Sequence, residues 1–122
     1  MEKSIRKQSI VLDLDDTICF PDHNQSDTFL KYGRAKPNSA VIEKLRELHS
    51  NGWYIIINSA RRMLTHSGDI SKIEADVSLT TKVWLRDNGV PYDELIFGKP
   101  YSSSYYVDDK AMTIEGFINW RT

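Results

Sequence analysis

The sequence predicts an α/β protein built as a Rossmann-like three-layer sandwich, with a mainly parallel sheet, helices on both of its faces and no cap domain. Short apolar runs alternate along the 122 residues with segments of helical periodicity, which favours strands joined by helical crossovers. Each apolar run is followed at once by polar residues, as expected where parallel strands end at one edge of a sheet. The length suits a single domain, and we assign residues 1–122 to it.

The first half of the chain is expected to contribute two strands and one helix. The apolar run near the N-terminus predicts a buried strand over residues 8–14. Residues 19–37 contain prolines and a glycine and look irregular, over a stretch long enough to suggest a function. A helix is expected over residues 38–50, with Asn38 as its N-cap. A second buried strand follows at 53–57.

The second half is expected to contribute two helices and two short strands. Residues 61–72 are polar and resemble a loop, and a helix is predicted over residues 77–88. Short strands are predicted at 95–97 and 105–107. A last short helix is expected over residues 114–120.

The composition excludes several classes of protein. Hydrophobic residues make up 40% and charged residues 27%, and the net charge of −1 gives no sign of a nucleic-acid or anionic membrane partner. The single cysteine, Cys19, cannot form an internal disulfide, which fits a reducing compartment. No apolar run reaches transmembrane length, and the one after the basic N-terminus is too short for a signal peptide. We therefore expect a cytoplasmic protein that binds neither membrane nor nucleic acid.

Two carboxylates follow the first predicted strand. Side chains alternate along a strand, so Asp13 and Asp15 are expected to start on the same face. Two acids this close need a cation or a shared proton, because like charges destabilise each other. Asp13 could then act as a nucleophile and Asp15 as a proton donor, with a hard metal between them. The plainer alternative is an acidic loop that caps a helix or merely binds a cation.

Polar residues at the ends of the other strands are expected to join this pair. Ser59 follows the second strand, Lys99 the third, and Asp108 and Asp109 the fourth. Together they would supply metal ligands, and a hydroxyl and an ammonium for phosphate oxygens, as phosphoryl transfer by a carboxylate nucleophile requires. Taken singly, Ser59 could cap the next segment, Lys99 could be a solvated turn residue, and the aspartate pair could cap a helix.

In this order, the residues resemble the four motifs of the haloacid dehalogenase superfamily of phosphatases. The matching positions are Asp13-x-Asp15-x-Thr17, then Ser59, then Lys99, then Asp108-Asp109. The segments 90–100 and 106–111 are similar, more narrowly, to small phosphatase-like proteins assigned to capsule and surface-polysaccharide biosynthesis. The resemblance implies a single haloacid dehalogenase-like hydrolase domain.

The resemblance also implies a role for each motif residue. Asp13 would attack phosphorus and form an aspartyl-phosphate. Asp15 would protonate the leaving oxygen and then activate water, and its backbone carbonyl would bind Mg²⁺. Ser59 and Lys99 would hold the phosphoryl oxygens.

The resemblance also implies which motif residues bind the metal and the substrate. The sequence departs from the family in two places. The metal ligands implied are Asp13 and Asp15 together with Asp108 and, through water, Asp109, while Thr17 would lie beside the substrate. Asp16 stands where a glycine is common, which adds negative charge near the metal. The residues at 101–104 differ from the near relatives, so the identity of the substrate stays open.

The loops at 19–37 and 61–72 follow the strands that carry the first two motifs, and should rim an open site. Arg61 is the best single candidate to contact the leaving group, because a guanidinium can bind a carboxylate or phosphate with two hydrogen bonds. The alternative is that Arg61 pairs with a nearby acid such as Asp15 or Asp69. A neighbouring subunit of a homo-oligomer could also cover the opening.

These inferences predict a Mg²⁺-dependent phosphomonoesterase acting on a small phosphorylated metabolite, such as a sugar phosphate of surface-polysaccharide biosynthesis. One alternative is a phosphatase for a macromolecular substrate, although the sequence has no basic patch for nucleic acid. Another is a catalytically silent binding or scaffold protein with the same fold. Transfer of the phosphoryl group to a second substrate instead of water also remains open.

Overall fold

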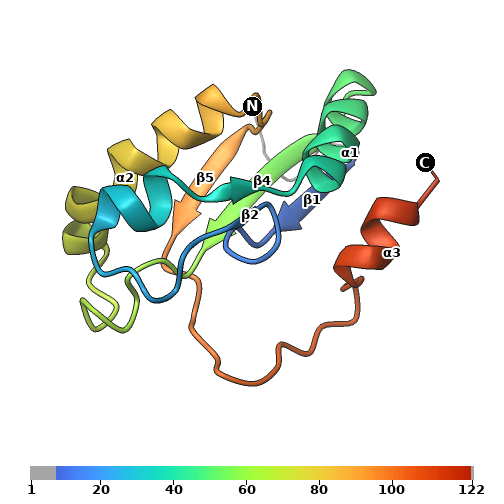
Figure 1. The fold of residues 1–122 in the computed structure, drawn as a ribbon. Helices are drawn as coiled ribbons and strands as arrows, with labels where there is room; N and C mark the ends of the chain where they lie inside the picture. The colour runs from blue at the N-terminus through green and yellow to red at the C-terminus, as the bar shows by residue number, and fades with distance from the viewer. Residues whose placement is uncertain (1–7, 122) are drawn as a thin grey trace.

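A three-stranded parallel sheet forms the centre of the computed structural model, which describes residues 8–121. Its strands are β1 (Ser9–Leu12), β4 (Tyr54–Ser59) and β5 (Glu94–Phe97), with β4 in the middle. Figure 1 shows the three arrows side by side and pointing the same way, so their carboxyl ends meet at one edge of the sheet. The predicted α/β fold class, with a mainly parallel sheet, is therefore confirmed.

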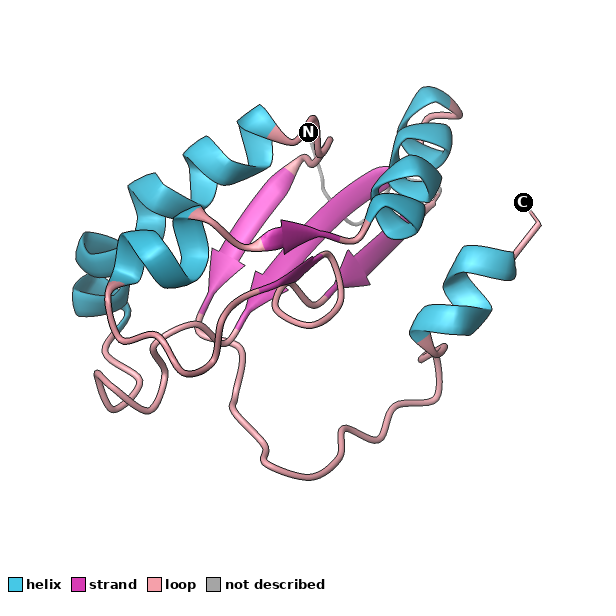
Figure 2. Ribbon diagram, in the orientation of Figure 1, coloured by secondary structure: helices cyan, strands magenta, loops and turns pink. Residues whose placement is uncertain are grey.

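The first crossover helix is the one that the sequence predicts. Helix α1 (Ser39–Ser50) connects β1 to β4 (Figure 2). The side chain of Asn38 accepts a hydrogen bond of 3.4 Å from the N–H of Val41, which caps the first turn. Asn51 follows as the C-cap, so both ends of the helix agree with the prediction.

The second crossover helix begins earlier than predicted. Helix α2 (Ile70–Asp87) connects β4 to β5, whereas the prediction placed its start near residue 77. Asp69 is the N-cap, since its carboxylate accepts a hydrogen bond of 3.2 Å from the N–H of Lys72. The first two turns carry polar residues that hid this start among the loop residues before it.

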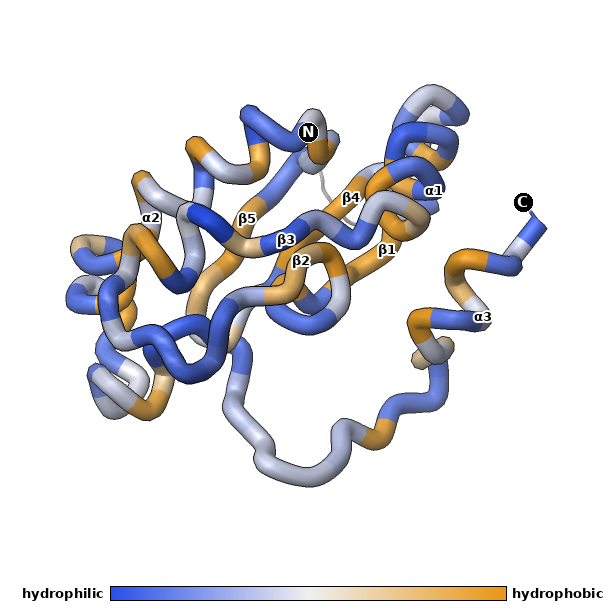
Figure 3. Tube along the Cα trace, viewed as in Figure 1, coloured by the Kyte–Doolittle hydropathy of each residue, from blue (hydrophilic) through white to orange (hydrophobic). Residues whose placement is uncertain are grey.

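The core lies between the sheet and the two crossover helices. Leu12, Ile55 and Ile57 alternate along their strands and are buried on the same face. The helices add buried side chains to the same cluster, namely Val41, Leu45, Leu48, Trp84 and Leu85. Figure 3 shows the strands as the most continuously apolar part of the chain. Val11 and Ile96, on the other face of the sheet, are exposed.

The segment 19–37 is more ordered than the sequence suggested. Its ends, β2 (Cys19–Phe20) and β3 (Lys36–Pro37), pair as a short antiparallel ribbon. Between them lies η2 (Phe29–Gly33), one turn of π-helix. The indole N–H of Trp84 donates a hydrogen bond of 2.9 Å to the carbonyl of Ala35, which fastens the segment to α2.

The predicted fourth strand at residues 105–107 does not form. Residues 98–113, which we call the arch, contain no strand or helix and run from β5 to α3 (Ile114–Asn119), as Figure 1 shows. Tyr105 is 86% and Val107 is 97% exposed. Strand propensity in Tyr and Val expresses itself only where a neighbouring strand and a packed face are present, and here the arch has neither.

The short helix α3 returns the chain to the body of the protein. Phe117 is buried in the main core cluster, and the rings of Trp53 and Trp120 meet edge to face at 5.2 Å. No part of the described chain forms a separate cap domain, and none of its helices combines the length and the apolar character needed to cross a membrane.

Candidate active site

The loop after β1 places three motif residues around one pocket. Asp13, Asp15 and Thr17 line a cavity of about 490 Å³ at the carboxyl edge of the sheet. Leu14 and Ile18, which alternate with them, are fully buried, and the N–H of Ile18 donates a hydrogen bond of 2.8 Å to the carbonyl of Leu14. The two apolar side chains therefore anchor a tight turn that presents the polar ones, as the alternation predicted.

Asp16 lies in the same turn with a left-handed backbone. Its φ is 64°, a conformation that glycine adopts freely and that aspartate tolerates better than most residues. This backbone conformation explains why the family that the motifs resemble commonly has glycine at the position of Asp16. The imidazole Nε2 of His23 lies 2.9 Å from both carboxylate oxygens of Asp16. The carboxylate added at this position is therefore in contact with His23.

Lys99 reaches the first aspartate from the end of β5. Its Nζ lies 3.2 Å from Oδ1 of Asp13, and the hydroxyl of Thr17 contacts the other oxygen at 3.5 Å. The N–H groups of Gly98 and Lys99 both donate hydrogen bonds of 3.1 Å to the carbonyl of Ser59. Gly98 has φ 100°, which requires glycine at this bend. Lys99 therefore lies at the same edge of the sheet as Asp13, while its predicted contact with phosphoryl oxygens stays a prediction.

Tyr106 supports Lys99 from the arch. The Nζ of Lys99 lies 4.2 Å from the centre of the Tyr106 ring. The Tyr106 hydroxyl donates to the carbonyl of Pro100 at 2.5 Å and accepts from the N–H of Ser102 at 2.9 Å. These contacts close the first part of the arch into a compact turn beside the pocket.

Arg61 is buried and bound to the second aspartate. Its Nε and one terminal nitrogen contact the two carboxylate oxygens of Asp15 at 3.0 and 2.8 Å. Its other terminal nitrogen donates a hydrogen bond of 2.8 Å to the hydroxyl of Thr81, and its guanidinium stacks 4.2 Å from the centre of the Tyr32 ring. Of the two interpretations open for Arg61, the structure therefore shows the pairing with an acid rather than a guanidinium free for a leaving group.

The pKa values of this cluster follow from burial and from Asp15. Burial alone would lower the pKa of the Arg61 guanidinium, but the charge and hydrogen bonds of Asp15 outweigh it and raise the pKa. Burial first, and then Asp15, raise the pKa of the Cys19 thiol well above its ordinary value. Cys19 is therefore an unreactive thiol packed beside the ion pair.

Ser59 does not have the position that the resemblance implied. Its side chain is 1% exposed, and its hydroxyl oxygen accepts a hydrogen bond of 3.0 Å from the N–H of Arg61. It is not among the described residues that line the pocket. The reason is the alternation along β4, which turns Ser59 toward the buried face with Ile57. Its contribution to the site is the carbonyl that holds the bend at Gly98 and Lys99.

Asp108 and Asp109 lie on the arch, away from the first two motifs. Both are exposed, because the strand that should have delivered them to the sheet edge does not form. A hydrogen bond from the N–H of Lys110, and then one with Asp109, lower the pKa of Asp108. Asp108 lines a second cavity, of about 580 Å³, that Asp13 and Lys99 also line. Asp13 and Asp108 therefore line one cavity, whereas Asp15 and Asp109 are not among the described residues that line it.

A second cluster of charges joins the two loops that rim the pocket. Asp76 of α2 lies 3.3 Å from Nε of Arg62 and 2.9 Å from Nε2 of His66, and Thr28 donates a hydrogen bond of 3.1 Å to it. Burial raises the pKa of Asp76, but the contacts with His66, Thr28 and Arg62 outweigh it and lower the pKa. The cluster fastens the segment 19–37 to the loop after β4, which sequence reasoning did not anticipate.

The three carboxylates that line the pocket each have a basic partner within 3.2 Å: Lys99 on Asp13, Arg61 on Asp15 and His23 on Asp16. The ammonium of Lys99 and the guanidinium of Arg61 offset the charge of Asp13 and Asp15. Across residues 8–121, no three His, Cys, Asp or Glu side chains are close enough together to hold a metal ion. The oxygen donors of Asp13 and Asp15 nonetheless have the chemistry that a hard cation such as Mg²⁺ prefers.

Comparison with solved structures finds a relative that matches almost the whole chain. An MCSG target protein from Vibrio cholerae is 35% identical to this chain, with a TM-score of 0.83. The match covers 94% of this chain and 90% of the Vibrio cholerae chain. No protein-family model matches the sequence, and no curated protein matches it.

Two more distant structures share the architecture. A chain of the Pnkp1/Rnl/Hen1 complex is 17% identical with a TM-score of 0.59, over 89% of this chain. D,D-heptose 1,7-bisphosphate phosphatase from B. bronchiseptica, crystallised with magnesium and phosphate, is 12% identical with a TM-score of 0.52, over 86% of this chain. This chain spans 33% and 54% of their lengths. At such identities the likeness shows the fold alone, a mixed α/β architecture with a mainly parallel sheet.

Proposed function

The chain belongs to the same family as the Vibrio cholerae protein, and from the geometry of its pocket we propose that it is a haloacid dehalogenase-type phosphomonoesterase. The observation that carries the proposal is the contact of 3.2 Å between Asp13 and Lys99, in a pocket that Asp15 also lines. A carboxylate nucleophile, an ammonium group beside it and a second carboxylate form the set that phosphoryl transfer needs.

Asp13 is the proposed nucleophile and Asp15 the proposed acid and base. A carboxylate oxygen of Asp13 attacks phosphorus, the bond from phosphorus to the leaving oxygen breaks, and that oxygen takes a proton from Asp15. Water then attacks the phosphorus of the aspartyl-phosphate while Asp15 takes its proton. Inorganic phosphate leaves, and the Asp13 carboxylate is restored.

Three further residues hold these groups in place. Lys99 already lies at Asp13 and can transfer its ammonium contact to the phosphoryl oxygens when a substrate binds. Thr17 contacts the second oxygen of Asp13 and lines the same pocket. Arg61 holds both oxygens of Asp15 and so fixes the direction in which that carboxylate faces. None of the three needs to be consumed or regenerated in the cycle.

We also propose that the enzyme uses Mg²⁺, held by Asp13, the backbone carbonyl of Asp15, Asp108 and, through water, Asp109. The ion would supply positive charge to the phosphoryl oxygens. Since Asp108 and Asp13 line one cavity of about 580 Å³, movement of the arch toward β1 would bring them together. The magnesium found with the B. bronchiseptica phosphatase supports metal use on this fold.

The proposed substrate is a sugar phosphate of surface-polysaccharide biosynthesis. The resemblance of residues 90–100 and 106–111 to proteins of that process supports this class, as does the heptose bisphosphate named for one structural neighbour. A pocket of about 490 Å³ is within the usual range for small ligands.

A panel of phosphorylated compounds tests the proposal. Phosphate release with Mg²⁺ should be measured on sugar phosphates, hydroxy-acid phosphates and an RNA oligonucleotide with a 3′-phosphate. Asp13→Asn should abolish turnover with the fold intact, because the amide cannot attack phosphorus. The matched control is Asp87→Asn, an exposed position at the end of α2 outside the pocket, which should keep full activity.

The outcomes separate the competing functions. If only the oligonucleotide is hydrolysed, the substrate is a nucleic-acid end and not a small metabolite. Retention of more than a few per cent of wild-type activity by Asp13→Asn would remove Asp13 as the nucleophile. The absence of turnover on the whole panel would favour a binding or scaffold protein with this fold.

A further inference from the structure

Among the described basic side chains that line the pocket, Lys31 is the one that forms no ion pair. The described residues lining the pocket include five bases: His23, Lys31, Arg61, Arg62 and Lys99. Four of these contact a carboxylate, namely Asp16, Asp15, Asp76 and Asp13 for His23, Arg61, Arg62 and Lys99 in turn. Lys31 contacts no acidic side chain within residues 8–121. The pocket therefore carries one positive charge that this part of the protein does not neutralise.

The surroundings of Lys31 are already positive. Its Nζ lies 5.3 Å from the centre of the Tyr32 ring, and the same ring has Arg61 at 4.2 Å and Arg62 at 5.3 Å from its centre. Three cations around one ring lie within about a Debye length, ~8–10 Å, of one another and repel. The carboxylates of Asp15 and Asp76 offset the charges of Arg61 and Arg62. Of the three cations around the ring, only Lys31 therefore has no acidic partner among the described residues.

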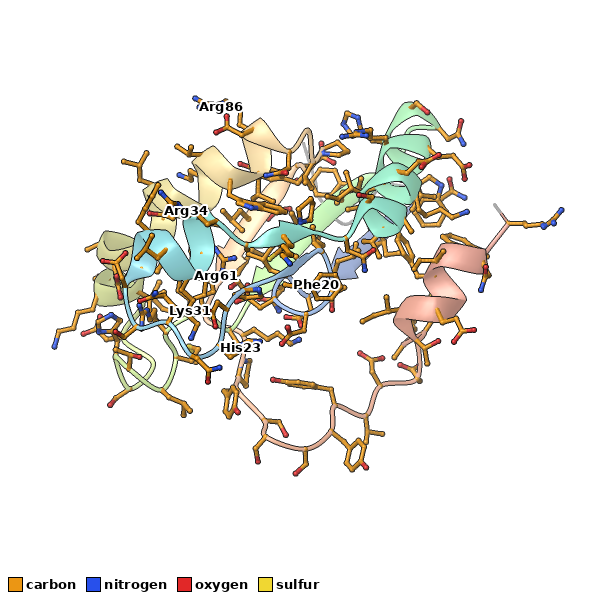
Figure 4. The ribbon with its side chains drawn as sticks, in the orientation of Figure 1. Phe20, His23, Lys31, Arg34, Arg61 and Arg86 are labelled. Atoms are coloured by element: carbon orange, nitrogen blue, oxygen red, sulfur yellow. The ribbon has the colours of Figure 1, made fainter. Side chains whose placement is uncertain are left out.

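The local fold holds Lys31 at the pocket. It lies in η2, where its N–H donates a hydrogen bond of 2.8 Å to the carbonyl of Asp27, and the next residue, Tyr32, is buried. Figure 4 labels Lys31 and His23, of the segment 19–37, near Arg61 of the loop after β4, and all three line the pocket.

We propose that Lys31 binds a second anionic group, carried by the leaving group of the substrate. This inference rests on the proposed phosphatase function. Asp13 and Lys99 take the phosphoryl group that reacts, and Lys31, on another segment of the same wall, takes a carboxylate or a second phosphate. The substrate class is then a phosphomonoester with two anionic groups rather than a neutral sugar monophosphate.

Two matched pairs of probes test the inference by turnover. The first pair is 3-phosphoglycerate and glycerol 3-phosphate, which differ by a carboxylate. The second pair is fructose 1,6-bisphosphate and fructose 6-phosphate, which differ by a phosphate. The wild-type protein should show kcat/KM about tenfold higher for the doubly anionic member of at least one pair, as expected for a hydrogen-bonded charge pair.

Substitution of Lys31 should remove that preference. In Lys31→Gln, kcat/KM should fall about tenfold further on the doubly anionic probe than on its partner, and Lys31→Arg should retain most of the preference. The matched control is Lys36→Gln, because Lys36 is an exposed lysine of β3 outside the pocket, and its removal should leave the preference unchanged. An equal loss on both members of each pair, or no wild-type preference in either, would overturn the inference.

A binding measurement separates this inference from the phosphatase proposal. With Asp13→Asn and Mg²⁺, calorimetry should give an affinity for 3-phosphoglycerate or for fructose 1,6-bisphosphate about tenfold above that for its partner. Adding Lys31→Gln should abolish the difference. If wild-type protein turns over none of these probes and no compound of the panel described above, but this pattern holds, the phosphatase proposal fails and the second anion site stands. If turnover occurs without the pattern, the site fails and the phosphatase stands.

Discussion

Removal of the buried guanidinium of Arg61 should destabilise the protein strongly. Arg61→Ala would leave the Asp15 carboxylate, whose side chain is 23% exposed, without the partner that holds both its oxygens. It would also remove the hydrogen bond to the Thr81 hydroxyl and the nearest of the three cations around the Tyr32 ring. Breaking a buried ion pair from one side costs about 3–5 kcal/mol, because an unpaired charge remains. Since Asp15 keeps some access to water, we expect a loss of about 3 kcal/mol in the free energy of unfolding.

The chain contains a matched control for this experiment. Arg86 and Asp87 form another Arg–Asp pair, with a contact of 2.9 Å, but their side chains are 74% and 57% exposed. Figure 4 shows Arg86 at the far end of α2 from Arg61. Because exposed pairs contribute about 0–1 kcal/mol, Arg86→Ala should change the free energy of unfolding by less than about 1 kcal/mol.

Urea unfolding, followed by tryptophan fluorescence and circular dichroism, measures both losses. A double variant, Arg61→Ala with Asp15→Asn, should recover about 1–2 kcal/mol relative to Arg61→Ala, because the stranded charge is removed. If the losses in Arg61→Ala and Arg86→Ala agree within about 1 kcal/mol, burial does not increase the contribution of the Arg61–Asp15 pair to the free energy of unfolding.

Three further measurements test the site and the fold. Exhaustive chelation should abolish phosphate release, and Mg²⁺ but not Zn²⁺ should restore it; full activity after chelation would refute the metal proposal. Gly98→Ala should lower the free energy of unfolding by about 1–3 kcal/mol, since φ is 100° and the new Cβ would lie 2.5 Å from Cδ1 of Ile70, whereas a neutral effect would mean that the bend relaxes freely. The pKa of Asp76 is below its usual 3.8 in the folded protein, so its contacts stabilise the fold above about pH 4 and are lost as the pH falls through the folded-state pKa. In Asp76→Asn, the free energy of unfolding should therefore fall less steeply with decreasing pH below about pH 4. The same steepness as in the wild-type protein would contradict this.

The parts of the site that the sequence could predict are those that depend on local periodicity. Asp13 and Asp15 follow a short apolar run, and Lys99 follows another, so parallel pairing brings them to one edge. The helix cap at Asn38 is a similar local signal, and the structure confirms that cap.

The parts that the sequence could not predict depend on contacts between distant segments. Tyr32 meets Arg61 and Arg62 only because η2 packs on α2, and nothing in its neighbourhood along the chain signals this. Ser59 follows the predicted strand, but its direction depends on which face of β4 the helices cover. The strand expected at residues 105–107 failed for a related reason, since propensity alone does not supply a partner strand.

The resting contact between Lys99 and Asp13 has a consequence for turnover, if the protein hydrolyses phosphomonoesters as proposed. Phosphate at the end of a cycle and the Asp13 carboxylate would compete for the same ammonium group, whose Nζ lies 3.2 Å from Asp13. The nucleophile would thus act as an internal competitor of the product. A partly exposed ion pair of up to about 1 kcal/mol would weaken product binding as much as about fivefold. An enzyme of this kind would release its product without a mobile lid. The reason is that Asp13, which forms the intermediate, would pair again with the Lys99 ammonium and so displace the phosphate from it.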